Sequence, residues 1–259
     1  TGRLSFRFPC GFRRSESTVD IAEMKAGSRN PVAASWIRRN RRLHRLLMPP
    51  RPLVENPAER LAESKCPMGR WNLYIGGAGS SVEGWVNVDI IRLPGLDVVC
   101  NAERLPFQRD RFTRVECDAV LEHAARPEMV LSEIHRCLEP GGTAHLVVPF
   151  CHPFHPYPSD YRRFTPDGLR LLLGPLSVLA EGWRTGPTAT LLVFTLEYCK
   201  LWMPSKTLRP VVHFLLGWLL FPLRYLDLIL FRIGRAGNIG NHFYMYLRKA
   251  PNSAFKGSD

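Results

Sequence analysis

The chain has 259 residues, which is enough to bury one sizeable hydrophobic core and to carry an appendage. Hydrophobic residues make up 45% and charged residues 22% of it, an ordinary globular composition that excludes a wholly disordered protein. The formal net charge of +12 is unevenly spread, because residues 1–70 hold 15 of the 35 basic residues but only 6 of the 23 acidic ones. Such a basic segment can contact phosphates, nucleic acid or anionic lipid, or it can simply be solvated.

The seven cysteines are odd in number, widely spaced and free of any C-x-x-C pair. This pattern predicts neither a disulfide framework nor a zinc site, and it fits a reducing compartment. The chain begins at Thr1 without a charged-then-apolar leader. These features together predict a cytoplasmic protein.

Residues 1–66 mix Arg, Pro and Ser with little periodicity, which predicts a basic, loosely ordered N-terminal arm. Residues 35–48 are the exception, because Trp36, Leu43 and Leu47 are interleaved with arginines. That stretch can form a basic amphipathic helix, which the proline pair at 49–50 would end.

From residue 67 to 259 short apolar segments alternate with helical ones, as in parallel βαβ units. A helix is expected to end at residues 140–142 (Pro-Gly-Gly), and another to begin at Thr165, with Pro166 in its first turn. The expected strands are 71–75, 85–90, 96–100, 114–119, 143–148, 178–185 and 242–248. The pattern predicts an α/β domain with a doubly wound, mostly parallel, seven-stranded sheet.

Before the last expected strand, residues 187–238 form an apolar insertion rich in Leu, Phe and Trp. Pro222, Arg224 and Asp227 interrupt its most apolar part, and a central Arg or Asp costs roughly 2.5–3.5 kcal/mol in a membrane span. A span is therefore disfavoured. Two alternatives remain open: short helices that lie on a membrane surface, or a helical cap packed on the domain or on another subunit.

Gly76, Gly77 and Gly79 follow the first expected strand. Because glycine has no side chain, a ligand can approach the backbone closely there. Asp89 ends the next strand, where a carboxylate can accept both hydroxyls of a ribose. Only residues 80–84 separate the glycine turn from this strand, so the helix that holds a pyrophosphate in dinucleotide-binding proteins has no room. The spacing favours a nucleoside without a pyrophosphate, and an ordinary tight turn is the alternative.

Four motifs follow one another in the chain: G-W-V-N-V-D at 84–89, N-A-E-R-L-P-F at 101–107, V-L-E-H at 120–123 and E-I-H-R-C-L-E-P-G-G at 133–142. This ordered set resembles the class I S-adenosylmethionine-dependent methyltransferases of the small-molecule type, over about residues 73–173. The resemblance implies a Rossmann-like methyltransferase fold and S-adenosylmethionine as the cofactor.

The resemblance also implies binding roles. Gly76, Gly77 and Gly79 would face the methionine part of the cofactor, and Asp89 would bind the ribose. The other implied contacts are Asn101 and Ala102 beside the adenine, Leu105 on its apolar face, and Asp118 and Ala119 near the sulfonium. A degenerate, non-catalytic member is an alternative, because Tyr74, Ala78 and Asn101 differ from the residues usual in the family.

A methyl sulfonium is already activated, so the protein mainly has to position the acceptor. Residues 149–165 follow a strand end and resemble an H-x-x-P-x-D-Y-x-R-F-T stretch of the same family. This predicts His155 as general base or acceptor orienter, Asp160 or Tyr161 as its assistant, and Arg163 as a grip for an anionic acceptor group. Alternatively, His155 and Asp160 only fasten the loop.

No metal is expected, because Ala119 stands where some relatives carry a carboxylate that helps to hold one. The sequence predicts a methyltransferase for a small-molecule, saccharide or lipid-linked acceptor, with residues 187–238 as a membrane contact in one interpretation. The alternatives are an RNA methyltransferase that uses the basic arm, and a degenerate methyltransferase-like binding module.

Overall fold

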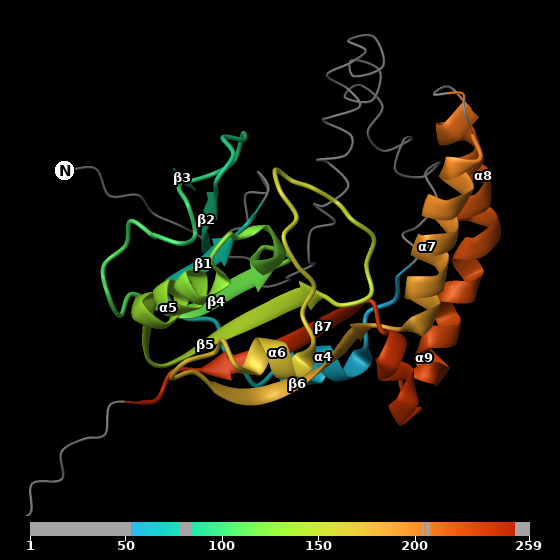
Figure 1. The fold of residues 1–259 in the computed structure, drawn as a ribbon. Coiled ribbons are helices and arrows are strands. Elements are labelled where there is room, and N and C mark those ends of the chain that lie inside the picture. Colours follow the sequence, from blue (N-terminus) through green and yellow to red (C-terminus); the bar gives the residue numbers. More distant parts are fainter. Residues whose placement is uncertain (1–52, 78–83, 204, 206–207, 252–259) are drawn as a thin grey trace, which may run out of the picture.

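The computed structural model describes residues 53–77, 84–203, 205 and 208–251. Within them a seven-stranded sheet forms the centre of the molecule (Figure 1). Its strands are β1 (Asn72–Ile75), β2 (Trp85–Asp89), β3 (Val98–Val99), β4 (Phe112–Asp118), β5 (Leu138–Pro149), β6 (Ser177–Thr185) and β7 (His242–Arg248). They lie in the order β3-β2-β1-β4-β5-β7-β6, and β7 runs antiparallel to both of its neighbours. The predicted doubly wound, mostly parallel sheet is confirmed.

Two predicted helix boundaries have different outcomes. The short helix α6 (Pro166–Arg170) begins as predicted, since the Thr165 side chain accepts a hydrogen bond from Gly168 N at 3.0 Å. The helix α5 (Pro127–Cys137), however, ends before the Pro-Gly-Gly run, which belongs to β5. Residues 141 and 142 exchange backbone hydrogen bonds with Lys249, just beyond β7. These bonds make the segment part of strand β5, although its sequence is typical of a helix end.

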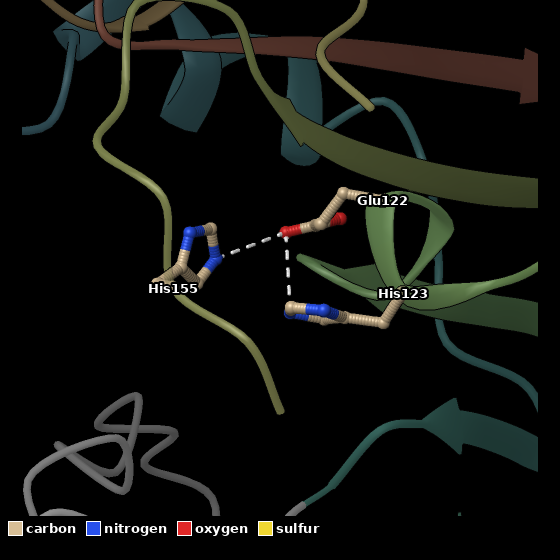
Figure 2. A group of neighbouring side chains, drawn as sticks. All are labelled: Glu122, His123 and His155. Carbon is tan, nitrogen blue, oxygen red and sulfur yellow. Dashed lines mark ion pairs between the residues drawn. The ribbon is translucent and has the colours of Figure 1, made fainter. Parts of the chain in front are cut away.

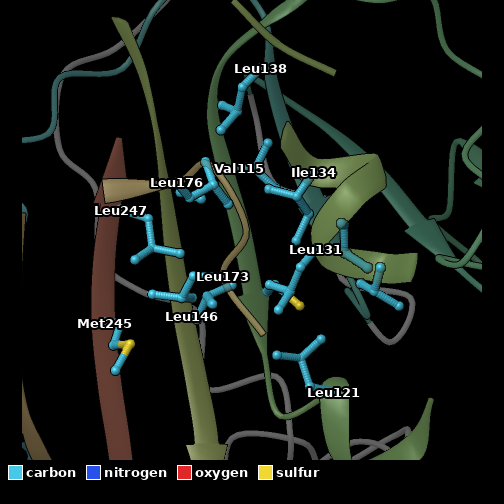
Figure 3. Close-up of a cluster of buried hydrophobic side chains, with 14 of the residues drawn as sticks. Val115, Leu121, Leu131, Ile134, Leu138, Leu146, Leu173, Leu176, Met245 and Leu247 are labelled. Atoms are coloured by element: carbon cyan, nitrogen blue, oxygen red, sulfur yellow. The ribbon is translucent and has the colours of Figure 1, made fainter. Parts of the chain in front are cut away.

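The two faces of the sheet differ in polarity because side chains alternate along each strand. In β4, Val115 and Cys117 point into the hydrophobic core, whereas Arg114 and Glu116 belong to the opposite face. The core includes residues from the strands, from α5, from the short helix η1 (Leu121–His123) and from the segment around α6 (Figure 3). Ten of its members are Val115, Leu121, Leu131, Ile134, Leu138, Leu146, Leu173, Leu176, Met245 and Leu247.

The opposite face is covered in part by helix α4 (Pro57–Glu63), which contacts β6 and β7. Asn56 caps this helix and also donates a hydrogen bond to Trp183 O at 3.0 Å. Glu55 forms a bridge with Thr185, and Cys66 is buried. The expectation of a loosely ordered arm is therefore wrong for residues 55–66, because long-range contacts fix a helix too short to show periodicity. Residues 1–52 of the arm, including residues 35–48, lie outside the described residues.

The apolar insertion forms helices that stand away from the sheet (Figure 1). They are α7 (Pro187–Leu201), α8 (Leu208–Leu220), η2 (Phe221–Leu226), α9 (Asp227–Leu230) and η3 (Gly234–Ile239). Helices α7 and α8 lie side by side. The continuous stretch Arg209–Leu230 is long and apolar enough to cross a membrane by length and composition alone, and only 11% of its apolar 18-residue window is buried.

Helices α7, α8, η2 and α9 together form a helical hairpin, and Asp227 fixes its base. Its carboxylate is fully buried and accepts hydrogen bonds from Thr188 N at 2.8 Å and Ala189 N at 3.0 Å. These amides belong to the first turn of α7, where unpaired N–H groups and the helix dipole favour an anion. Asp227, which the sequence shows only as a charge within an apolar run, thus joins the two ends of the hairpin.

Candidate functional site

The backbone turn after β1 requires glycine. Gly76 has φ +77°, and its N–H donates a hydrogen bond to Val88 O at 2.8 Å. A Cβ atom at Gly76 would lie 2.3 Å from Val120 Cγ2, and one at Gly77 would lie 2.2 Å from Asn87 Oδ1. Both the conformation and the lack of space therefore disfavour a side chain at Gly76, and the lack of space disfavours one at Gly77.

Asp89 lies at the same edge of the sheet as this turn. Ile75 pairs with Val88 across β1 and β2, so Gly76 and Asp89 are the next residues on two adjacent strand ends. Asp89 Oδ1 accepts a hydrogen bond from Ile91 N at 3.0 Å, which holds the carboxylate at the strand end. The structure thus brings these two predicted binding residues together, whereas Gly79 lies outside the described residues.

The residues expected near the adenine follow β3. The exposed Asn101 accepts a hydrogen bond from Glu103 N at 2.9 Å through Oδ1 and so stabilises the turn there. Ala102 is half-buried and packs against the hydrophobic core, of which Leu105 is a buried member. Their roles in cofactor binding stay predictions.

The two residues expected near the sulfonium follow one another at the end of β4. Asp118 Oδ2 accepts a hydrogen bond from Arg184 Nη1 at 2.7 Å, and Arg184 also pairs with Glu55. Ala119 has φ +53°, a conformation that is uncommon for residues other than glycine and often occurs at functional sites. The Arg184 contact escaped the sequence analysis, because nothing in the local pattern links β6 to β4.

The loop after β5 is held by an internal ion pair. Arg163 contacts both oxygens of Asp160, at 2.5 and 2.8 Å, and donates further hydrogen bonds to the carbonyl groups of His152 and Pro153. The guanidinium holds the pKa of the Asp160 carboxyl far below its usual range. Asp160 also accepts a hydrogen bond from His155 N at 2.8 Å. The structure therefore engages Arg163 within the loop, and its role as an acceptor grip stays a prediction, as does assistance by the exposed Tyr161.

Glu122 and two histidines form a compact group beside this loop, shown in Figure 2. Glu122 Oε1 lies 3.8 Å from His123 Nε2 and 3.7 Å from His155 Nε2. The Glu122 carboxylate raises the pKa of His155. Burial lowers the pKa of the neighbouring His152 to about 4. His155 therefore faces a buried anion, a contact that the sequence analysis missed.

A sequence signal for this group did exist. Glu122 and His123 follow β4 and His155 follows β5, and these two strands are adjacent and parallel in the sheet. Residues that follow the carboxyl ends of adjacent parallel strands lie at one edge. The sequence could therefore have predicted that the V-L-E-H motif and the loop histidines lie close together.

The fold and this edge of the sheet define a class of protein. A doubly wound sheet binds its ligands outside the carboxyl ends of its strands, where this chain presents a side-chain-free turn next to a carboxylate. Such an edge suits a nucleoside ligand, so the chain has the features of a nucleoside-binding α/β protein.

Comparison with known proteins specifies the class. A family model described as "Methyltransferase domain" matches residues 85–146, from β2 into β5. No curated protein sequence matches the chain. Over residues 85–146 the chain is thus similar to methyltransferases, and S-adenosylmethionine is the cofactor that this match and the doubly wound sheet support.

Several solved structures are similar to the chain at low identity. A putative sarcosine dimethylglycine methyltransferase from Galdieria sulphuraria is 16% identical, with a TM-score of 0.48 over 74% of this chain and 83% of that one. The 1,6-didemethyltoxoflavin-N1-methyltransferase of Burkholderia thailandensis, solved with S-adenosylhomocysteine, is 15% identical, with a TM-score of 0.43 over 93% and 94%. The [4+2]-cyclase SpnF is 15% identical, with a TM-score of 0.48 over 75% and 81%.

The described residues fit this cofactor. The turn at Gly76 and Gly77 has no space for side chains of its own and can present its backbone to the methionine part. Asp89, one strand away, can accept the ribose hydroxyls. When bound, the cofactor supplies an activated methyl group, so the chain has to orient the acceptor and exclude water.

Proposed function

We propose that this methyltransferase acts on a small-molecule, saccharide or lipid-linked acceptor at the cytoplasmic surface of a membrane, and that His155 orients or deprotonates the acceptor. The acceptor class follows from the resemblance of its motifs to the small-molecule type. A cytoplasmic location agrees with the unpaired pattern of its cysteines. The observation that carries the membrane surface is the exposed apolar face of the helical hairpin.

Helix α7 exposes one apolar stripe. Leu191, Phe194, Tyr198 and Leu201 are all exposed, at spacings of three or four residues that put them on one face of the helix. Leu192 and Leu196 lie on another face and are buried. The helix is therefore apolar on both its packed and its open side.

The returning arm of the hairpin repeats this arrangement. Its exposed apolar residues include Val211, Leu215, Leu219, Leu226 and Ile229, again at helical spacing along α8, η2 and α9. Soluble monomers rarely expose large contiguous apolar patches, and those that do commonly use them for contact with a membrane or a partner.

Aromatic and cationic side chains favour a membrane as the occupant. Trp202, Trp218 and Tyr225 are exposed on the hairpin, and such rings are typical of the lipid headgroup region. Arg224 lies over the Tyr225 ring, 4.8 Å from its centroid, and the chain as a whole carries a net charge of +12. The apolar face suits the acyl chains of a membrane, and the positive charge suits anionic lipid headgroups.

The dimensions of the hairpin support contact with one surface. The 15 residues of α7 make a helix about 22 Å long, shorter than a hydrocarbon core of about 30 Å. The Asp227 contacts with Thr188 and Ala189 hold the returning helix at the start of α7. A hairpin that leaves the domain and returns to it is better suited to lie in one leaflet than to span the bilayer.

Flotation of the full chain with vesicles containing anionic lipid tests this proposal. We expect the protein to float, and we expect the triple variant Leu215→Ser, Leu219→Ser, Leu226→Ser to stay in the dense fraction, because it loses exposed apolar contacts only. A matched variant that changes Leu61, Met68 and Leu171 to Ser, all exposed outside the hairpin, should float as the original does.

Equal flotation of the two variants, or no flotation of the unchanged protein, would reject the membrane surface. Retention on RNA that falls steeply with salt would instead favour the RNA methyltransferase alternative.

The cofactor site is tested separately by calorimetry with S-adenosylhomocysteine. Asp89→Ala should weaken binding about 100-fold, because two charge-assisted hydrogen bonds to the ribose are lost. Asp167→Ala changes a carboxylate that is 92% exposed and lies in helix α6, and should leave binding unchanged. Undiminished binding by Asp89→Ala would remove Asp89 from the site.

A further inference from the structure

The carboxylate of Glu122 is buried, and its nearest ion-pair partners among the described residues are two histidines. Its side chain is 0% exposed, and neither oxygen accepts a hydrogen bond from the described residues. A carboxylate removed from water is strongly destabilising unless a positive charge or several donors lie close to it. A cation close to Glu122 would therefore stabilise the folded protein. Glu122 lies in η1, and its carboxylate points toward His123 and His155 (Figure 2).

The hydrogen bonds of the two imidazoles leave their Nε2 atoms facing Glu122. His123 Nδ1 donates to the Ser159 carbonyl oxygen. His155 Nδ1 lies 3.0 Å from the Pro153 carbonyl oxygen and 3.4 Å from Asp160 Oδ2, two acceptors that outweigh the Arg163 Nη2 contact at 3.3 Å. Because carbonyl oxygens only accept, each Nδ1 carries a hydrogen, and in the neutral imidazole each Nε2 then keeps its lone pair.

Three lone pairs thus converge on one point. One ligand atom from each of the three side chains lies within 4.8 Å of the other two, and Glu122 Oε1 lies 3.8 Å from His123 Nε2 and 3.7 Å from His155 Nε2. Ligand atoms about 2.0–2.2 Å from one metal ion lie roughly 3.0–3.5 Å apart, so a small inward rotation of the rings would bring the three side chains to the spacing of metal ligands. Histidines that donate Nδ1–H to a carbonyl oxygen and point Nε2 inward are the usual arrangement in metal sites.

We propose that Glu122, His123 and His155 bind a divalent transition-metal ion such as Zn²⁺. Two imidazoles and one carboxylate suit this class of ion better than Mg²⁺ or Ca²⁺, which favour oxygen ligands alone. Three protein ligands leave further coordination positions open, and the His155 side chain is 33% exposed, so the ion is within reach of solvent and of small molecules.

This proposal replaces the expectation that the chain holds no metal. That expectation depended on Ala119, which stands where some relatives carry a carboxylate ligand. The site proposed here does not use that position, because its third ligand comes from the loop after β5. It stands on the geometry of the three side chains, and with an ion bound His155 would orient the acceptor and not deprotonate it, because its Nε2 lone pair is then a ligand.

Metal binding by the full chain, purified without a polyhistidine tag and treated with a chelator, tests the site. We expect one Co²⁺ to bind per chain with the visible absorption of a protein-ligated ion, and Zn²⁺ to displace it. Glu122→Gln and His155→Asn should each weaken binding at least about 100-fold, since loss of a direct ligand costs no less than loss of its supporting contacts.

His213→Asn, in α8, is the matched control and should bind like the unchanged protein. Thermal unfolding provides a second readout, because a bound ion raises the melting temperature of the unchanged protein and of the control but not of Glu122→Gln.

Two results would overturn the proposal. One is that the unchanged protein binds no more Co²⁺ than Glu122→Gln does, as expected if a proton alone balances the carboxylate. The other is that Glu122→Gln keeps its affinity while His152→Asn loses it, which would place the ion on the neighbouring histidine.

Discussion

His145 within β5 and His155 in the loop after β5 both lie against buried glutamates, but their surroundings differ in charge. His145 Nδ1 lies 2.6 Å from Glu116 and its Nε2 lies 3.1 Å from Glu59. Arg114 in turn pairs with Glu116. Burial by itself would lower the pKa of His145, but the two carboxylates raise it to about 9. This group therefore balances its own charges at neutral pH.

The group around Glu122 has no such balance. Among the described residues no arginine donates a hydrogen bond to Glu122, and the two imidazoles face it with their Nε2 atoms. The same residue types thus occur in a group that balances its own charges and in the group for which we propose metal binding. In the group around His145, arginines pair with glutamates of helix α4 and so fasten that helix to the sheet. In the group around Glu122 no such pairs form among the described residues, and a cation could balance the carboxylate.

The largest difference between the two groups should appear in stability. Glu116→Ala leaves Arg114 and the charged His145 buried with one anion fewer, which should cost about 3–5 kcal/mol of unfolding free energy. Glu122→Gln in metal-free protein removes an anion without donors and should cost nothing or stabilise the fold. Urea unfolding of both variants measures the contrast, and equal losses would contradict it.

The pH dependence of stability should report His145. Its folded pKa of about 9 exceeds the unfolded value of 6.5, so its contribution is complete below pH 6.5 and is lost as the pH rises through 9. The shift corresponds to roughly 3 kcal/mol. Unfolding free energies measured from pH 6 to 10 should fall by about this amount, and His145→Asn should flatten the curve. An unchanged slope in that variant would refute the charged state.

A smaller effect is expected from the loop that positions His155. Asp160→Asn weakens the ion pair with Arg163 and the support of His155 N, and should cost about 1–3 kcal/mol in stability. It should also reduce metal affinity about 10-fold, because His155 is held less firmly. Lys200→Gln breaks an exposed ion pair on α7 and should change neither quantity. Urea unfolding and Co²⁺ titration check both, and full metal affinity in Asp160→Asn would show that the loop does not position the ligand.

The local patterns of the chain were sufficient for the sheet and for part of the site. The short apolar segments between helical ones located all seven strands, and the Thr165 cap with Pro166 located the start of α6. Both signals depend only on neighbouring residues. Gly76 and Asp89 could be paired in advance, since the residues that follow successive parallel strands meet at one edge.

The tertiary structure alone decided which polar groups meet. Arg184 reaches Asp118 from a distant strand, and Glu122 meets His155 across 33 positions of the chain. Helix α4 forms where periodicity was too short to detect, because β6 and β7 provide its partner surface. Hydrophobic periodicity reports that a residue is buried but not what lies opposite it, so ion pairs and converging ligands appear only when the segments are packed.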